Sequence, residues 1–588
     1  MRSYLALVAA FGSALAAGAA TLAQEGGAVF APAQGGVAVP GVPGGPGLPP
    51  RDRGRTAAKG TASIRGRITA AGSTAPLRRA QVTVTAVEGI GRYTTTTDGE
   101  GRFDVPELPA GRYAINVSKG GYVTLQYGQR RPFETGTPVT LADAQAMTGV
   151  NLALPKGSVI AGRITDEFGE PVAQAQVSAQ RYQYGPDGQR RLQPFGIPVT
   201  TDDLGQFRLH SLMPGEYVVS ASFRNMFVAP LGTAGGDTSE GFLPTFHPGT
   251  VNANEAQPVT VTLGQESHVQ FALSAARMAR VSGVVVDSTG RAVANGIVML
   301  MPSSGIVSGM LTTAQIATDG AFSVSNVAPG DYVLNVQPMG AFAATDRSPE
   351  TAAVPLAVGG ADINGVRVVT SAGTLLSGRV EFEGTASRAT PLPWRVYAQP
   401  NAPGPAAFGI GLGGAANGTV AEDGAFQLQV AAAAAMLLRV AGSPAWAMKA
   451  VLLDGEDVTD TPLDWAGKGG ATSLRIVMTD RLTTVSGRVV DSRGRPLTDY
   501  AVIIQPEEAQ AGVVAARYLR LARPDQSGSF RVTGLPPGRY AATAVETFEQ
   551  GRQFVPDVQA RLKERAKTFS LDEGGTATLD LPLTSGVE

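Results

Sequence analysis

The chain has 588 residues, with 74 Gly, 40 Pro, 16% charged and 6% aromatic residues, which predicts an all-β protein with many turns and several domains. The 48 Lys and Arg balance the 49 Asp and Glu, so no overall charge would attract nucleic acid or an acidic membrane. Cysteine is absent, which excludes disulfides, thiolate metal sites, cysteine nucleophiles and the lipid-bearing cysteine of a bacterial lipoprotein.

The N-terminus has the pattern of an export signal. Arg2 is followed by an Ala- and Leu-rich run and then by small residues, so we expect residues 1–23 to be a cleaved signal peptide, with an uncleaved membrane anchor as the alternative. Residues 24–60 are rich in Gly and Pro without apolar periodicity, which predicts a disordered linker. No later apolar stretch is long enough to span a bilayer. We therefore expect a periplasmic, outer-membrane-associated or extracellular protein.

Beyond the linker the chain repeats. Five segments open with a short apolar run that a glycine interrupts: Gly66, Gly162, Gly283, Gly378 and Gly487. These glycines lie 95 to 121 residues apart, a spacing suited to one β-sandwich each. The sequence therefore predicts a tandem array of five Greek-key β-sandwich modules, the fourth of them diverged: 61–155, 156–275, 276–371, 372–480 and 481–588.

Each segment contains one recurring hairpin, first seen as TTTTDGEGRFDVPELPAGRYAINV at 94–117. An Asp and a Gly predict a tight turn, a Phe begins the next strand, and a Tyr ten residues later follows a second turn. Such a Tyr is typical of the tyrosine corner of Greek-key sandwiches, where its hydroxyl binds the backbone. The fourth copy has Met436 where the Tyr belongs. Because five turns carry an equivalent Asp, we interpret these residues as structural and not as calcium ligands: Asp98, Asp202, Asp319, Asp423 and Asp525.

The modules also end on strands, a few residues before the next module begins. This spacing predicts neighbours placed end to end in a semi-rigid rod. The second module carries an extra loop around 225–250, and residues 557–569 of the fifth predict a short helix.

Together these residues resemble the carboxypeptidase regulatory-like domain, a transthyretin-like sandwich of the carbohydrate-binding-like fold. The second module shows the family pattern most fully, in Gly162-Arg-Ile164, Asp166-Glu-Phe-Gly169-Glu-Pro171, Thr201-Asp-Asp-Leu-Gly205-Gln-Phe207 and Leu212-Met-Pro214-Gly215-Glu-Tyr217. The resemblance implies a non-catalytic accessory module, of a kind found beside peptidases, on outer-membrane transporters and in extracellular arrays. It implies little about activity, because such sandwiches serve many functions.

The chain lacks the motifs of common catalytic sites. Its three histidines, His210, His247 and His268, have no second ligand at zinc spacing. The glycines of 409–414 follow a G-x-G-x-x-G pattern without the strand and helix that a dinucleotide site requires, so we interpret them as a loop. We therefore predict no enzyme activity and no cofactor.

The remaining candidate site is a set of tryptophans. Trp394, Trp446 and Trp465 all lie in the fourth module, and their arrangement has two interpretations: a repacked core, or an exposed platform for a sugar ring or a partner chain. Under the second interpretation, Trp465 is the ring that we expect to be exposed. We thus predict a non-catalytic binding or scaffold protein with a glycan or protein partner. The alternatives are a structural rod and an accessory subunit of an extracytoplasmic peptidase or outer-membrane transporter.

Overall fold

The computed structural model describes residues 59–584 except 89–90, 186–189, 224–239, 304–311, 339–349, 389–392, 401–416, 431–434, 466–472 and 509–516. The expected signal peptide, nearly all of the expected linker, the 409–414 loop and most of the extra loop of the second module lie outside these residues. The described residues contain no helix long and apolar enough to cross a membrane.

Five hydrophobic cores follow one another along the chain, and we name the units around them sandwiches 1 to 5. A sixth, smaller cluster of buried residues also lies in sandwich 5, around Ile503 and Leu562. The all-β tandem fold is thus confirmed. Sandwich 1 contains β1 (Ala62–Ala70), β2 (Gln81–Ala86), β3 (Arg92–Thr96), β4 (Arg102–Leu108), β5 (Gly111–Ser118), β6 (Leu125–Gln126), β7 (Val139–Leu141), β8 (Ala146–Met147) and β9 (Leu152–Leu154). Sandwich 2 contains β10 (Ser158–Thr165), β11 (Ala175–Tyr184), β12 (Arg190–Thr200), β13 (Gln206–Leu212), β14 (Gly215–Phe223), β15 (Glu240–Phe242), β16 (Thr245–Phe246), η1 (Ala253–Glu255), β17 (Val259–Val261) and β18 (Glu266–Ala272).

The other three sandwiches are built in the same way. Strand β19 (Ala275–Arg277) leads into sandwich 3, with β20 (Ala279–Val286), β21 (Gly296–Pro302), β22 (Thr312–Gln315), β23 (Ala321–Val327), β24 (Gly330–Pro338), β25 (Ala352–Val358) and β26 (Ile363–Val369). Sandwich 4 contains β27 (Thr374–Glu383), β28 (Arg395–Pro400), β29 (Asn417–Thr419), β30 (Ala425–Val430), β31 (Met436–Ala441), β32 (Ala447–Leu453), β33 (Glu456–Asp457) and β34 (Leu474–Thr479). Sandwich 5 contains β35 (Thr484–Val490), β36 (Ala501–Pro506), β37 (Arg520–Ala522), β38 (Ser529–Thr533), β39 (Gly538–Val545), η5 (Arg552–Phe554), α1 (Pro556–Lys563), β40 (Lys567–Leu571) and β41 (Thr576–Thr584). The predicted helix is confirmed as α1, but it is shorter than expected: it ends at Lys563, and residues 567–569 of the predicted helix belong to β40.

The repeated glycine lets the first and last strands of each sandwich approach closely. These two strands pair in parallel in every sandwich, as β1–β9, β10–β18, β20–β26, β27–β34 and β35–β41. A Cβ built on Gly162 would lie 1.7 Å from the carbonyl oxygen of Val269 on the last strand and 3.1 Å from the ring of Phe207. The other four opening glycines meet the same kind of carbonyl at 2.5 Å or less. The glycine is therefore required by packing at this position.

The tyrosine corner is present wherever the Tyr is. The four hydroxyls donate to the carbonyl four residues earlier, at 2.7 to 2.9 Å: Tyr113 to Pro109, Tyr217 to Met213, Tyr332 to Ala328 and Tyr540 to Pro536. All four rings are buried. The hairpin therefore serves the core and the Pro-Gly turn beside it.

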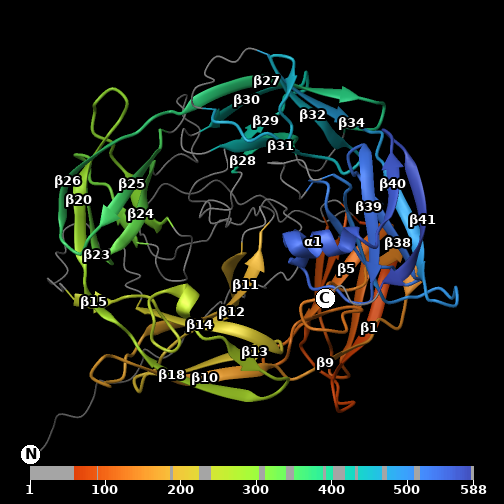
Figure 1. The fold of residues 1–588 in the computed structure, drawn as a ribbon, viewed down its shortest axis with the longest axis horizontal. Coiled ribbons are helices and arrows are strands. Elements are labelled where there is room, and N and C mark those ends of the chain that lie inside the picture. Colours follow the sequence, from red (N-terminus) through yellow and green to blue (C-terminus); the bar gives the residue numbers. More distant parts are fainter. Residues whose placement is uncertain are drawn as a thin grey trace, which may run out of the picture.

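The sandwiches follow one another around a closed ring, so the expected rod is wrong (Figure 1). In sandwiches 2, 3 and 4 the sheet that holds the opening strand lies on the outer side of the ring, and the second sheet lies on the inner side. Helix α1 of sandwich 5 also lies on the inner side (Figure 1). Neighbours do lie end to end, but sandwich 5 returns to contact sandwich 1, where Gln526 binds the backbone of Thr140.

Candidate functional site

The turn aspartates have structural roles. In three turns the first Asp accepts backbone N–H bonds from the residues two and four positions later, as Asp202 does from Leu204 (3.0 Å) and Gln206 (2.8 Å). In sandwiches 3 and 4 the Asp stands two positions further on, so Asp319 and Asp423 each cap one amide. The described residues contain no group of three or more His, Asp or Glu able to hold a metal ion.

The tryptophans lie in the core of sandwich 4, so the expected exposed platform is wrong. Trp394, Trp446 and Trp465 are only 8%, 6% and 2% exposed. Trp465 donates its indole N–H to the carbonyl of Met436 at 3.0 Å, and Met436 stands where the other sandwiches have the corner Tyr. Trp394 and Trp446 pack edge-on against Phe382 at 4.9 and 5.0 Å. The diverged core is thus filled by tryptophan, and none of the three rings can stack on a sugar.

The histidines are not brought together either. His210 and His268 are exposed on separate strands of sandwich 2. His247 packs edge-on against Phe271, and burial lowers the pKa of its imidazole below the usual range.

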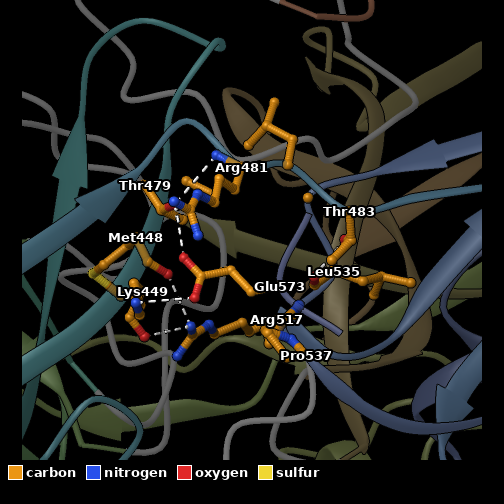
Figure 2. A pocket seen from close by; sticks show the side chains of 13 residues that line it. Met448, Lys449, Thr479, Arg481, Thr483, Arg517, Leu535, Pro537 and Glu573 are labelled. Carbon is orange, nitrogen blue, oxygen red and sulfur yellow. Dashed lines mark hydrogen bonds and ion pairs between the residues drawn. The ribbon is translucent and has the colours of Figure 1, made fainter. Parts of the chain in front are cut away.

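Charged residues join sandwich 4 to sandwich 5. Lys449 contacts Glu573 of sandwich 5 at 3.0 Å (Figure 2). It also contacts Glu383 of its own sandwich at 2.7 Å, and the two hydrogen bonds raise the pKa of Lys449. Asp460 accepts from Arg517 at 2.8 Å and from Tyr518 at 2.9 Å. A cavity of about 30 Å³ lies beside these groups, between the two sandwiches. That volume suits one water molecule and excludes a sugar ring.

A second, open cavity of about 260 Å³ lies in sandwich 5, where β40 begins and β41 joins β39. It is lined by Ala542, Ala544, Arg565, Ala566, Lys567, Leu581, Pro582 and Thr584. This lining has neither a carboxylate nor an aromatic ring, so it offers no acid–base pair and no stacking platform.

Sandwich 5 closes the ring against sandwich 1. Gln526 pairs through its side-chain amide with both backbone groups of Thr140, at 3.0 and 2.9 Å. Arg130 contacts Asp499 at 3.1 Å, and Arg131 contacts Glu546 at 3.2 Å. These partners are separated by more than 350 positions in sequence, and no local pattern indicates them.

Phe133 lies where sandwiches 1, 2 and 5 meet. The guanidinium of Arg181 in sandwich 2 stacks 3.3 Å from the centre of its ring and contacts Glu549 of sandwich 5 at 2.9 Å. The carbonyl of Phe133 accepts from the backbone N–H of Gln550 at 3.1 Å. Next to it, Glu134 is 7% exposed and its Oε1 has no hydrogen-bond partner within the described residues. Burial raises the pKa of that carboxyl, while the nearby Arg523 opposes the rise.

Searches for similar proteins give one family and several structures. The family model described as the carboxypeptidase regulatory-like domain matches residues 63–155 and 159–232. No curated protein matches the chain. The solved structures include the TIE protein of Bacillus anthracis, with 13% identity over 53% of this chain and 51% of that chain, and a TM-score of 0.14. A streptococcal ancillary pilin has 13% identity over 53% and 99%, with a TM-score of 0.19.

A third structure, the minor pilin GBS52 of Streptococcus agalactiae, has 10% identity over 36% of this chain and 95% of that chain, and a TM-score of 0.20. Scores this low carry no information on function. The family match covers sandwich 1 and most of sandwich 2, where the opening glycine, the Asp turn and the tyrosine corner are all present in the structure. Residues 63–155 and 159–232 of the chain are therefore carboxypeptidase regulatory-like domains.

Proposed function

We propose that the chain is an exported, non-catalytic scaffold that binds other proteins through the surfaces of its ring. The observation that carries the proposal is the set of contacts between sandwiches 1, 2 and 5 and between sandwiches 4 and 5. They hold surfaces from separate modules in set relative positions, which suits the binding of large partners. The two cavities described above offer no arrangement of groups suited to catalysis.

Sugar binding is the second candidate, and it rests on the family resemblance alone. With all three tryptophans in the core, this candidate has lost the aromatic platform that favoured it. An accessory role beside a peptidase or a transporter is one form of the scaffold function, because it also requires a protein partner.

The test uses the purified mature chain in three assays. We expect it to retain defined partners from an envelope fraction of its own source cells, to bind no glycan on an array, and to hydrolyse neither peptide nor glycoside substrates. Saturable glycan binding without protein partners would favour the second candidate. Hydrolysis by the chain alone would overturn both.

A further inference from the structure

Two turns at one end of sandwich 2 lie side by side. They are Asp166–Glu170, between β10 and β11, and Asp202–Gln206, between β12 and β13. Backbone N–H of Ile164 donates to the carbonyl of Gly205 at 2.9 Å, and Thr165 forms a bridge with Pro171. A Cβ built on Gly205 would lie 3.2 Å from the side chain of Pro171. The third residue of each turn therefore projects from the same end of the sandwich.

Both of these residues are large, apolar and exposed. Phe168 is 83% exposed and Leu204 is 54% exposed. We name this pair the apolar tip. Each turn is held by its own Asp, since Asp166 caps the amides of Phe168 and Glu170 at 2.9 and 2.8 Å. The turns thus form without any packing by the apolar side chains, whose exposure to water is unfavourable.

The other sandwiches show that the turns do not require apolar residues. In sandwiches 3 and 5 the first turn is closed by the same backbone bond, from the N–H of Asp287 to the carbonyl of Arg291 and from the N–H of Asp491 to the carbonyl of Arg495. The third residue of this turn is Thr289 in sandwich 3 and Arg493 in sandwich 5. The second turn recurs in all five sandwiches with the same bond. Its third residue is polar in four of them: Glu100, Asp319, Asp423 and Ser527. Sandwich 2 therefore differs from its neighbours in having two exposed apolar residues on neighbouring turns, at positions where the fold does not require them.

The charge around the tip indicates what binds there. Four exposed carboxylates belong to the same two turns: Glu167, Glu170, Asp202 and Asp203. They outnumber the neighbouring cation, Arg163, whose Nε donates to the carbonyl of Leu204 at 3.0 Å. An anionic bilayer would be repelled by this charge. A protein surface with an apolar pocket bordered by Lys and Arg would bind both the side chains and the carboxylates, the arrangement found at the centre and rim of protein interfaces.

We propose that the apolar tip, Phe168 and Leu204 with their four flanking carboxylates, docks into an apolar pocket with a basic border on a partner protein. This inference rests on the proposed scaffold function and names the chemistry of one partner site.

The probe is a phage library of random 12-residue peptides, panned on the full chain and counter-selected on the Phe168→Ser/Leu204→Ser variant. We expect enriched peptides that combine apolar residues with Lys or Arg. A synthetic copy should bind the wild type at least about tenfold more tightly than the variant in fluorescence anisotropy, since two apolar contacts are lost. Binding should also weaken several-fold between low and high salt, because the carboxylates are exposed.

Two controls show that the loss is specific. The Thr289→Ser variant alters the matching turn of sandwich 3 and should bind the peptide as the wild type does. The Phe168→Ser/Leu204→Ser variant should melt at the wild-type temperature, because both side chains are exposed.

Several outcomes would overturn the proposal. Failure to enrich peptides, enrichment of peptides without basic residues, or equal binding to the variant would each do so. Tip-dependent binding to phosphatidylethanolamine–phosphatidylglycerol vesicles would make the tip a membrane contact instead. Tip-dependent self-association in sedimentation velocity would make a second copy the occupant. The scaffold function fails separately, if the wild-type chain retains no partner from the envelope fraction.

Discussion

At the residue scale, the corner Tyr of sandwich 5 illustrates a role that was predictable from sequence. Tyr540 is 1% exposed and donates to the carbonyl of Pro536 at 2.7 Å. Its replacement by Phe should cost about 1 kcal/mol, the contribution of one such hydrogen bond. Hydrogen exchange should show faster opening of the amides of β39, since exchange reports on sandwich 5 by itself. Unchanged exchange in β39 would mean that the hydroxyl does not hold the corner.

A second residue-scale prediction concerns the buried Glu134. Burial raises the pKa of its carboxyl above the ordinary 4.5, so the folded protein binds this proton more tightly than the unfolded chain does. The stability that protonation contributes is complete below pH 4.5 and is lost as the pH rises through the raised pKa. The Glu134→Gln variant should lack this dependence. Its melting temperature should therefore rise relative to that of the wild type between pH 4.5 and pH 7. If the two melting temperatures differ by the same amount at every pH in that range, the carboxyl of Glu134 does not have a raised pKa.

At the element scale, the parallel pairing of first and last strands depends on the opening glycine. A Cβ on Gly487 would lie 1.8 Å from the carbonyl oxygen of Leu579, so Gly487→Ala must push β41 away from β35. We expect a loss of about 3 kcal/mol, at the upper end for an overpacked core. The matched control is Gly494→Ala, which has open space around it and a φ of +77°. It should cost only about 1 to 2 kcal/mol, from the left-handed backbone. Similar costs in thermal unfolding for the two variants would refute the packing role.

Some of these elements could be predicted from the sequence, and others could not. The glycine, the Asp turn and the Tyr recur, so their shared geometry was predictable, and α1 was predictable from its local pattern. The burial of Trp465 was not, because Pro462, Asp464 and the glycines after it are typical of an exposed loop. The segment instead pairs with β31 through mutual backbone bonds between Met436 and Leu463, at 2.9 and 3.1 Å. A contact across 27 positions leaves no periodic trace in the sequence.

For the whole molecule, the ring was equally hidden from sequence, because its closing contacts join exposed residues of distant modules. Arg130, Arg131 and Gln526 each contact the opposite sandwich across the junction of sandwiches 1 and 5. Exposed ion pairs are each worth about 1 kcal/mol or less, so the ring should open only when several contacts are removed together.

The combined variant Arg130→Glu/Arg131→Glu/Gln526→Ala therefore tests closure. It replaces two attractions by repulsion from Asp499 and Glu546 and removes the paired amide of Gln526. We expect a larger radius of gyration in small-angle X-ray scattering, with each sandwich still folded. The control, Arg208→Glu, breaks an exposed pair with Glu266 inside sandwich 2 and should leave the radius unchanged. If the combined variant also keeps the wild-type radius at low salt, closure must rest on the remaining contacts. These include the ones around Phe133, where Arg181 and Gln550 join sandwiches 2 and 5 to sandwich 1, and the bond from Arg112 of sandwich 1 to the carbonyl of Arg531 at 3.2 Å.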